Sequence, residues 1–442
     1  MENINTKTLS GFMELLPEEQ IEFDRLKSII ESTYHQFGFT SLDTPLVERS
    51  EVLLAKGSQE TDQQVYYVTN GLFSKEKYTQ ALRFDLTVPL ARYVAEHFND
   101  LSFPFRRCHI NRVYRGERAQ KGRFREFYQC DIDVIGRNEL SIYYDAEIPS
   151  IIYQLFKKLN LGKFTIRINN RKILNGLFAD LGISASSEEV LRIIDKAEKI
   201  SHEELLSSLR EIKLTEAQIR SLLSFMNIKG ETESKIKQLH ELGITNQLFT
   251  DGVNELKIVN DIMLQMGVDP DYFRIDLSVA RGLDYYTGTV YETVLEDSRI
   301  GSVCSGGRYD NLAGHYTSEK LPGVGISIGL TRLFWQLREN NMLQCQRRTI
   351  ADVIVVPENS GNIRGALKTA AKIRASGLNV DVLLEDVAMK KKLQYITKKE
   401  SRFTVIVKNG ESGDEILSLQ YIDGGTLKKE PLPIEQLIGR IT

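Results

Sequence analysis

The stretch from Phe105 to Gly136 constrains the fold more than any other part of the sequence, because its side chains alternate between two chemically different faces. In its second arm one face is largely apolar: Phe124, Tyr128, Cys130, Ile132 and Val134. The other face is polar apart from one ring: Arg123, Arg125, Phe127, Gln129, Asp131 and Asp133. A short polar connection ending at Gly122 joins this arm to the first, where Arg115 and Glu117 share a face. The pattern predicts an antiparallel β-hairpin with one face in the core.

The polar face of this hairpin has two explanations. Exposure to water is the ordinary one, but a solvated strand face usually mixes lysine, glutamate and threonine. This face carries arginines and a phenylalanine, residue types that bind phosphate through two hydrogen bonds and stack on a base. Burying its acids and arginines without partners would be too costly. We therefore expect the face to line a ligand site.

Composition sets the class of protein. At 442 residues the chain is long for one hydrophobic core, which predicts two or three domains. Hydrophobic residues make up 41% and charged residues 26%, the proportions of a soluble globular protein. The 57 Lys and Arg residues nearly balance the 60 Asp and Glu residues, giving a net charge of −3. Any contact with RNA must therefore come from local patches rather than from a bulk positive field.

The sequence lacks the motifs of several common kinds of site. The four cysteines have no CxxC spacing and the six histidines form no HExxH, so we expect neither a disulfide framework nor a protein-built metal site. There is also no GxxxxGK[ST] phosphate loop. The N-terminus has no apolar signal region and no run of about 18 apolar residues occurs, which predicts a cytoplasmic protein with no membrane contact.

The N-terminal part of the chain predicts a helix and two strands. A helical pattern covers residues 17–37. A strand-like run over residues 40–47 follows, and its proline predicts a short or edge strand. Residues 82–91, LRFDLTVPLA, predict another strand with Asp85 and Thr87 on one face.

Residues 180–266 have a helical texture. Openings of the capping-box type recur in three pairs: Ser186 with Glu189, Ser201 with Glu204, and Thr215 with Gln218. Apolar residues at helical spacing follow each pair, so we expect a helical insertion. Its mixed lysines and glutamates indicate a solvated face.

Beyond about Arg348 the pattern changes to alternating strands and helices. The expected strands are Ala351 to Val356, Leu378 to Leu384 and Phe403 to Val407, and the expected helices are Ile363 to Arg374 and Val387 to Lys398. This order predicts a βαβαβ unit with a parallel sheet, without GxGxxG after its first strand. The run Lys390 to Lys392 is either a phosphate-contacting patch or a solvated helix end.

Three glycine-containing peptides lie between the helical segment and the C-terminal domain. RGLDYY at residues 281–286 continues into TGTVYE, with turns on both sides of a ring pair. SGGRYD at residues 305–310 has paired glycines that let backbone approach a ligand closely. GVGISIGLTRLF at residues 323–334 predicts a strand entering a helix, with Arg332 in the first turn. Taken singly, surface turns and core packing would explain them.

The hairpin resembles motif 2 of the class II aminoacyl-tRNA synthetases: an Arg two residues before a Glu, a variable loop, then Arg and Phe. GRFREFYQ, followed in order by RGLDYY and SGGRYD, is most similar to the histidyl-tRNA synthetases, while FGFTSLDTPLVER and GVGISIGLTRLF resemble motifs 1 and 3. The resemblance implies an α+β catalytic domain with a central antiparallel sheet, a helical insertion, and a C-terminal α/β domain with a mainly parallel sheet. The implied catalytic domain covers residues 1–178 and 267–345, the insertion 179–266, and an anticodon-binding domain 349–442.

The implied activity is that of a histidine–tRNA ligase. Such an enzyme activates L-histidine with ATP and Mg²⁺ to histidyl-adenylate, and then transfers histidine to the 3′-terminal adenosine of tRNA(His). Motif 1 implies a homodimer. Selectivity for histidine over other amino acids would come from hydrogen bonds to the imidazole, which has one donor and one acceptor.

The resemblance also implies roles for individual residues. The residues implied to bind histidine are Asp85, Thr87, Arg115, Gln129, Asp133, Arg281, Tyr285 and Tyr286. ATP binding falls to Arg115, Glu117, Arg123, Phe127 and Arg332. Arg281 and Arg115 are the implied catalytic residues, and Arg118 and Gln120 are candidate tRNA contacts.

Two alternatives remain open on the sequence. One is a histidine-binding regulatory subunit of ATP phosphoribosyltransferase, which shares the catalytic fold but would lose the charged residues and the anticodon-binding module. The other is a prolyl or threonyl enzyme, which would lack RGLDYY. The sequence departs from the histidyl pattern at Asp85, where bacterial members often have Glu.

Overall fold

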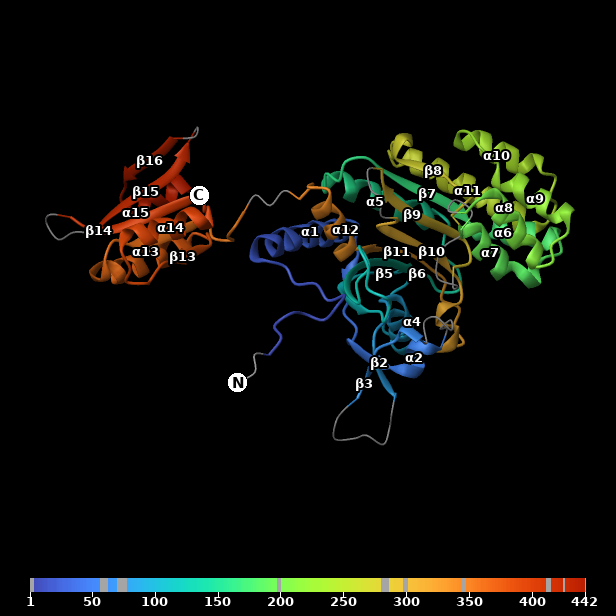
Figure 1. Ribbon diagram of the computed structural model, residues 1–442, viewed down its shortest axis with the longest axis horizontal. Coiled ribbons are helices and arrows are strands. Elements are labelled where there is room, and N and C mark those ends of the chain that lie inside the picture. The colour runs from blue at the N-terminus through green and yellow to red at the C-terminus, as the bar shows by residue number, and fades with distance from the viewer. Residues whose placement is uncertain are drawn as a thin grey trace. The chain divides into compact units, whose positions relative to one another are not determined.

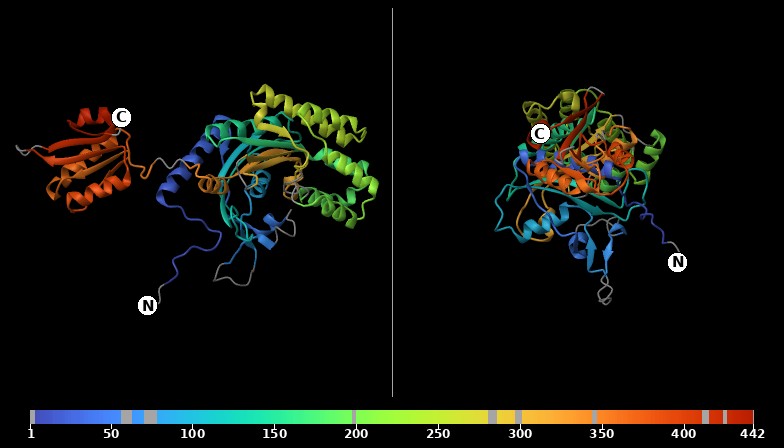
Figure 2. Two further views of the ribbon diagram at one scale, coloured as in Figure 1. Left: turned by 45° about the horizontal axis from the view of Figure 1, so that its top comes forward. Right: turned by 90° about the vertical axis from the view of Figure 1, so that its left-hand side faces the viewer.

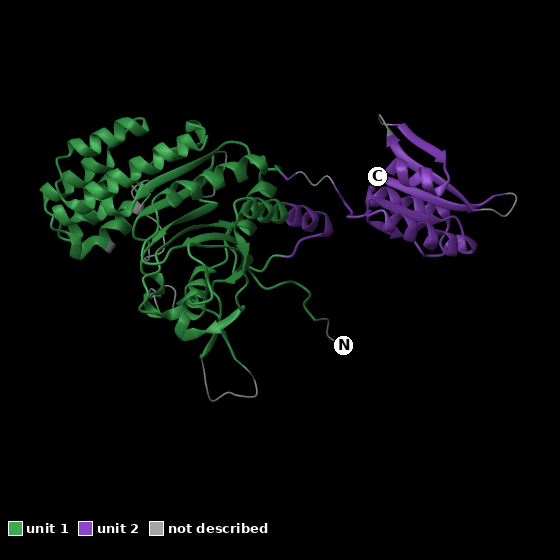
Figure 3. Ribbon diagram, turned by 180° about the vertical axis from the view of Figure 1, so that it is seen from behind, with its two compact units in different colours: residues 1–13, 26–342 green, residues 14–25, 343–442 purple. Residues whose placement is uncertain are grey.

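The computed structural model describes residues 4–55, 63–69, 78–196, 200–279, 286–296, 301–343, 347–410, 415–423 and 426–441. These residues divide into two compact units, residues 1–13 with 26–342 and residues 14–25 with 343–442 (Figure 3). Within the described residues, the larger unit holds an eight-stranded and a three-stranded sheet, and the smaller unit holds a five-stranded sheet. Each unit is therefore built on its own sheet.

The eight-stranded sheet is the framework of the larger unit (Figure 1). Its strands, in spatial order, are β1 (Thr40–Ser41), β5 (Phe105–Tyr114), β6 (Glu126–Ile135), β11 (Gly323–Gly329), β10 (Cys304–Tyr309), β9 (Thr289–Leu295), β7 (Phe164–Asn170) and β8 (Phe273–Ile275). Neighbours from β5 to β7 pair antiparallel, whereas β1 with β5 and β7 with β8 pair parallel at the two edges. The expected central antiparallel sheet is confirmed.

The predicted hairpin is formed by β5 and β6, which pair from Phe105 opposite Ile135 to Tyr114 opposite Glu126. Gly122 adopts a φ of 72° in the connection, a conformation that favours glycine. Alternation holds from the start of β6, but not before it: Phe124, expected in the core, precedes the strand and lines a cavity instead.

The apolar face of β6 is covered by α1 (Pro17–Gln36), the helix that the sequence predicted. Tyr34 on this helix is fully buried, and its hydroxyl donates a hydrogen bond to the backbone oxygen of Cys130 at 3.1 Å. Phe23, Leu26 and Ile30 are buried on the same helix, at the spacing of a helical stripe. One face of the hairpin is thus fixed in the core.

The strand expected over residues 82–91 is wrong. A strand, β4 (Gln80–Leu82), ends where the prediction begins, and α4 (Thr87–Glu96) starts five residues later. The helix starts here because Asp85 Oδ1 accepts hydrogen bonds from the backbone N–H groups of Thr87 and Val88, at 3.1 and 2.9 Å. A proline in the first turn of α4 is also compatible with a helix start and incompatible with a central strand.

The strand expected over residues 40–47 is also wrong in extent. Its ends fall in two different sheets: β1 joins the large sheet, and β2 (Val47–Arg49) joins β4 and β3 (Tyr67–Val68) in the small one. The prediction of a short or edge strand is confirmed, because β1 has two residues and lies at the edge of the large sheet, and Pro45 lies in the link between β1 and β2. A short helix, α2 (Ser50–Leu54), follows β2.

The remaining helices of this unit include the helical segment expected from the capping boxes. They are α5 (Tyr143–Lys158), α6 (Arg171–Asp180), η1 (Ser184–Ser186), α7 (Ser187–Lys196), α8 (His202–Glu211), α9 (Glu216–Met226), α10 (Thr232–Glu241), α11 (Gln247–Gln265), η3 (Pro270–Tyr272), η4 (Leu312–His315) and α12 (Leu330–Glu339). Capping boxes form at Ser201 and Thr215. Helices α6 to α10 lie together beside the β7 side of the sheet in Figure 1, and the turned view in Figure 2 shows the same grouping.

The smaller unit contains the predicted βαβαβ order. Its elements are β12 (Val353–Pro357), η5 (Ser360–Asn362), α13 (Ile363–Ala375), β13 (Val380–Val382), α14 (Met389–Lys399), β14 (Phe403–Asn409), β15 (Glu415–Asp423), β16 (Thr426–Pro431) and α15 (Ile434–Ile441). Strand β12 pairs parallel with β13 and β14, as expected. Strands β15 and β16 extend the sheet antiparallel and were not predicted.

The lysine run on α14 is only partly a surface feature. Lys390 and Lys391 are exposed, but Lys392 is 1% exposed and its Nζ donates a hydrogen bond to the backbone oxygen of Pro357 at 2.8 Å. Lys392 therefore fastens α14 to the end of β12, and the expectation that it contacts a phosphate is wrong. Among the described helices, none is long and apolar enough to cross a membrane.

Candidate active site

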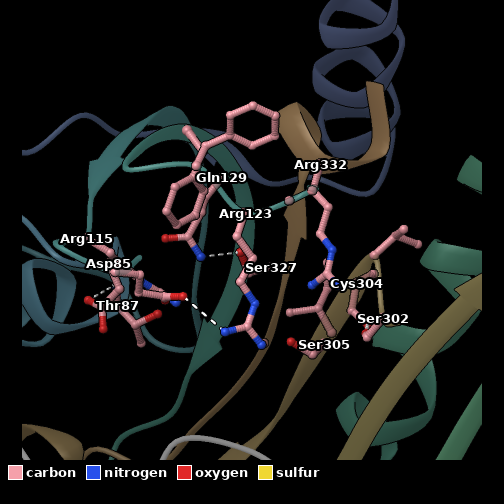
Figure 4. A pocket seen from close by; sticks show the side chains of 18 of the residues that line it. Asp85, Thr87, Arg115, Arg123, Gln129, Ser302, Cys304, Ser305, Ser327 and Arg332 are labelled. Atoms are coloured by element: carbon pink, nitrogen blue, oxygen red, sulfur yellow. Dashed lines mark hydrogen bonds and ion pairs between the residues drawn. The ribbon is translucent and has the colours of Figure 1, made fainter. Parts of the chain in front are cut away.

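A cavity of about 450 Å³ opens over the polar face of β6 (Figure 4). Strands β6, β10 and β11, the start of α12 and the loop before α4 all contribute to its wall. Ten of the residues singled out in the sequence line it: Asp85, Thr87, Arg115, Glu117, Arg123, Phe127, Gln129, Asp133, Tyr286 and Arg332. Residues far apart in the sequence are therefore brought to one place.

The other residues singled out in the sequence lie elsewhere or cannot be placed. Arg118 and Gln120 are exposed on the connection between β5 and β6, and neither lines the cavity. Arg281 and Tyr285 lie outside the described residues. Tyr286, the last residue of RGLDYY, does line the cavity, so that peptide ends at its wall.

Asp85 stands at the start of α4 and is 5% exposed. Its carboxylate is held by the two backbone N–H groups that begin the helix. Burial raises the pKa of Asp85, while the Val88 N–H and the Arg115 guanidinium act in the opposite direction. The acid is thus fixed in place by backbone, with Thr87 beside it on the same cavity wall.

Asp133 lies deeper, with an exposed fraction of 3%. One carboxylate oxygen is 2.8 Å from the Arg107 guanidinium, and the other accepts a hydrogen bond from the Tyr309 hydroxyl at 2.9 Å. Burial raises the pKa of Asp133, and Arg107 and Tyr309 oppose the rise. The sequence interpretation missed both partners, although Arg107 stands directly opposite Asp133 in the hairpin ladder.

Gln129 is held at the same wall by a residue that was not predicted. Its Nε2 donates a hydrogen bond to Ser327 Oγ at 2.7 Å, the contact drawn in Figure 4. Its Oε1 is buried and has no hydrogen-bond partner within the described part of the chain. A buried acceptor without a donor is costly, so Gln129 is prepared to accept a hydrogen bond from a ligand.

The cations of the cavity come from the connection between β5 and β6 and from α12. Arg115 follows β5, donates a hydrogen bond from Nε to the Phe84 oxygen at 3.1 Å, and has its guanidinium carbon 5.3 Å from the centre of the Phe127 ring. Arg123 is in the hairpin connection, with a guanidinium nitrogen 3.4 Å from Glu117. Arg332 is in the first turn of α12, as predicted. These guanidinium groups can together bind a polyanion.

Glycine in β11 makes room for the acid at the cavity floor. A Cβ at Gly325 would lie 2.3 Å from Asp133 Oδ1 and 2.4 Å from the Ile132 oxygen. No larger residue fits without moving Asp133 or the neighbouring strand. The glycine-rich sequence of β11 therefore serves close approach between strands.

Comparison with known proteins shows which family this chain belongs to. The family model described as histidyl-tRNA synthetase matches residues 11–333, and the one described as anticodon binding domain matches residues 352–442. A histidine–tRNA ligase from Clostridium tetani is 50% identical over 437 residues, 98% of each chain. Another from Finegoldia magna is 46% identical over 439 residues, 99% of this chain and 100% of the relative. The crystal structure of a histidyl-tRNA synthetase from a Nostoc species aligns with a TM-score of 0.89 and 40% identity, covering 99% of both chains. The chain therefore belongs to the histidyl-tRNA synthetase family of enzymes.

Proposed function

We propose that the cavity over β6 is where this chain carries out the reaction of its family, the ligation of histidine to tRNA. The observation that carries the proposal is the distribution of charge in one cavity. Buried acceptors (Asp85, Gln129 and Asp133) and guanidinium groups (Arg115, Arg123 and Arg332) line the same space. An amino acid and a nucleoside triphosphate together carry the complementary groups: an ammonium group for the acceptors, and a carboxylate and phosphates for the guanidinium groups.

The acidic wall fits L-histidine. An α-ammonium group has three N–H donors, and Asp85, Thr87 and Gln129 supply oxygen acceptors. The imidazole would lie against Asp133 and the Tyr286 hydroxyl, which offer complementary donors and acceptors. A site whose polar groups are left unpaired by the wrong side chain discriminates by about 10⁴ to 10⁵.

The guanidinium groups fit ATP, which enters as its magnesium complex. Phe127 stacks on adenine and Glu117 accepts from its amino group, because both lie beside Arg115 in the cavity. Arg115 holds the α-phosphate, and Arg123 with Arg332 holds the distal phosphates. The magnesium ion would offset phosphate charge and would be held chiefly by phosphate oxygens and water, as is usual for Mg²⁺ in nucleotide sites.

The first step joins two anions. A carboxylate oxygen of histidine attacks the α-phosphorus of ATP, the bond from that phosphorus to the bridging oxygen breaks, and pyrophosphate leaves. Arg115 and Arg281 offset the repulsion between carboxylate and phosphate. In the second step a ribose hydroxyl of the 3′-terminal adenosine of tRNA(His) attacks the carbonyl carbon of histidyl-adenylate, and AMP leaves.

The assignment of Arg281 rests on the sequence and has a direct test. Arg281→Ala should abolish adenylate formation while histidine still binds, because one fixed cation typically contributes about 10² to 10³ in rate. Pyrophosphate exchange measures the first property and calorimetry the second. Exchange at the wild-type rate in this variant would contradict the role given to Arg281.

We further propose a cytoplasmic homodimer whose residues 179–266 form an insertion domain and whose residues 349–442 contact the anticodon. Arg118 and Gln120 are exposed beside the cavity-lining hairpin, where an acceptor end could reach them. The regulatory-subunit alternative is not favoured, because the cavity keeps Arg115 and Arg332 and an anticodon-binding domain is matched.

Pyrophosphate exchange run with each standard amino acid tests the whole proposal, and exchange driven by an amino acid other than histidine would contradict it.

A further inference from the structure

Asp131 is a buried acid on the polar face of β6 that the proposed reaction does not use. It is 1% exposed, points to the same side of the strand as Gln129 and Asp133, and is not among the residues lining the cavity. Burying an ionisable carboxyl is costly, and a cross-strand pair with a purely structural role does not need one. Its neighbours indicate what it does.

Ser327 connects Asp131 to the cavity wall. It stands directly opposite Asp131 in the β6–β11 ladder, a position where Cβ atoms lie about 4.5 to 5.5 Å apart. Ser327 Oγ is also the atom that accepts the hydrogen bond from Gln129 Nε2 (Figure 4). The serine hydroxyl therefore lies between the buried acid and the amide that faces the cavity.

The hydroxyl hydrogen of Ser327 needs an acceptor. A hydroxyl donates one hydrogen and accepts through its lone pairs, so while Ser327 accepts from Gln129 its own hydrogen points elsewhere. Asp131 lies opposite Ser327 in the β6–β11 ladder, and Asp131 Oδ1 has no hydrogen-bond partner within the described residues, so it is free to accept this hydrogen. Burial raises the pKa of Asp131 to about 7, while Arg107 opposes the rise and the Ser327 hydroxyl also lowers it. Above neutral pH the carboxylate is an ionised acceptor.

We propose that Asp131, acting through Ser327, fixes the amide of Gln129 so that its oxygen, and not its nitrogen, faces the substrate ammonium group. While Asp131 accepts from Ser327, the serine can only accept from the amide nitrogen, which leaves Oε1 for the ligand. Without that acceptor the hydroxyl can turn and donate to the amide oxygen. The amide then rotates and places N–H donors against the N–H donors of the ammonium group. Asp131 is thus a positioning residue for histidine binding, and this inference rests on the proposed function.

The test compares L-histidine with imidazolepropionate, the analogue that lacks the α-amino group. The measured quantity is the dissociation constant of imidazolepropionate divided by that of L-histidine, both determined by calorimetry at pH 8. Asp131→Ala removes the acceptor and should lower this ratio about tenfold, the effect of losing one hydrogen bond to a charged group. Binding of the analogue should stay within about threefold of wild type. In steady state the KM for histidine should rise about tenfold, with kcat and the KM for ATP nearly unchanged.

Two further variants separate positioning from charge and from general damage. Ser327→Ala removes the hydroxyl and should lower the ratio as much as Asp131→Ala, and the double variant should be no worse than either single one. Asp131→Asn keeps an oxygen acceptor of the same shape without the charge. Its ratio of dissociation constants should therefore be close to that of wild type. Ser327→Ala and Asp131→Asn keep the test decisive if Asp131→Ala does not fold.

Other outcomes would overturn the inference. Additive effects of Asp131→Ala and Ser327→Ala would mean that the two residues act separately. Equal losses in Asp131→Asn and Asp131→Ala would show that charge, and not orientation, is responsible. Gln129→Met tests the underlying assignment: if it leaves the ratio unchanged, the ammonium group is not bound there and the proposed function needs revision. If Gln129→Met lowers the ratio and the other variants do not, the positioning role alone fails.

Discussion

At the scale of single residues, buried acids are concentrated at the cavity wall and directly behind it. Asp85, Asp131 and Asp133 are each at most 5% exposed, and burial raises the pKa of all three. Arg107 is fully buried, lies 2.8 Å from Asp133 and also opposes the pKa rise at Asp131. Such an arrangement costs folding free energy and is typical of functional sites.

Replacing Asp131 should therefore stabilise the protein at high pH. Burial raises its pKa from the ordinary 3.8 to about 7, so the folded state favours the protonated form. The unfolded chain loses this proton near pH 4 and the folded chain near pH 7, so the penalty grows across that window and is complete above it. Asp131→Asn should raise the free energy of unfolding by up to about 4 kcal/mol at pH 8 and by almost nothing at pH 4.

Denaturant unfolding at the two pH values measures this difference. A stabilisation of equal size at pH 4 and pH 8 would show that the ionisation of Asp131 is not its cause. Comparison of the variant with wild type at each pH removes the contribution of other titrating groups.

Arg332→Ala should slow adenylate formation about 10² to 10³-fold and weaken ATP binding, because it removes a guanidinium group from the cavity wall. Histidine affinity should change little. Single-turnover kinetics with varied ATP separates the two effects. Arg338→Ala, in the last turn of the same helix, is the matched control and should behave as wild type. Full activity in Arg332→Ala would remove this residue from the site.

At the scale of elements, β11 has little freedom to vary at Gly325. Gly325→Ala should raise the KM for histidine more than tenfold, because the new Cβ would meet Asp133 Oδ1 and the Ile132 oxygen. It should also destabilise the fold by about 1 to 3 kcal/mol, the usual cost of overpacking. Gly439→Ala in α15, where a Cβ would meet nothing within 4 Å, is the control. Unchanged histidine kinetics in Gly325→Ala would contradict the close packing.

The sequence predicted well those elements whose apolar side chains repeat at a regular spacing or whose first residues are typical of a helix or turn. Helix α1, the pairing of β5 with β6, and the entry of β11 into α12 depend on local alternation and on turn residues, which a single sequence displays. Residues 82–91 misled because Leu86, Val88 and Leu90 alternate as in a strand, while Asp85 in fact caps a helix. The capping role was visible in an Asp two residues before Thr87 and in a proline two residues after it.

Tertiary partners were the part of the site that local patterns could not supply. Ser327 and Tyr309 reach the cavity from β11 and β10, and their contacts with Gln129 and Asp133 join residues 198 and 176 positions apart. Lys392 looked like a surface charge because a lysine run gives no sign of which member is turned inward. The order and register of the strands decide the contacts of Ser327 and Tyr309, and the packing of α14 against the end of β12 decides that of Lys392.

At the scale of the whole molecule, each unit has a core of its own. In the smaller unit a buried cluster joins β12, β14 and β15 to α13 and α15, with Val355, Ile373 and Leu419 among its members. The larger unit contains the cavity. Two cores predict two cooperative unfolding transitions.

Ligands should act on these transitions unequally. Histidine at about a hundredfold above its dissociation constant should stabilise the larger unit by about 2.7 kcal/mol and leave the other transition where it is. Scanning calorimetry with and without histidine measures both transitions. A single transition that shifts as a whole would show that the two units unfold together. The variant Gln129→Met, with weakened histidine binding, supplies the control.

The two-residue period of β6 also limits how this family of sites can diverge. One extra residue inside the strand would exchange its faces, turning Gln129 and Asp133 toward α1 and the apolar residues toward the substrates. Insertions and deletions are therefore easier to accommodate in the connection before the strand, near the exposed Arg118 and Gln120, than inside the strand. New substrate preferences would have to arise by exchange of side chains on a strand of constant length.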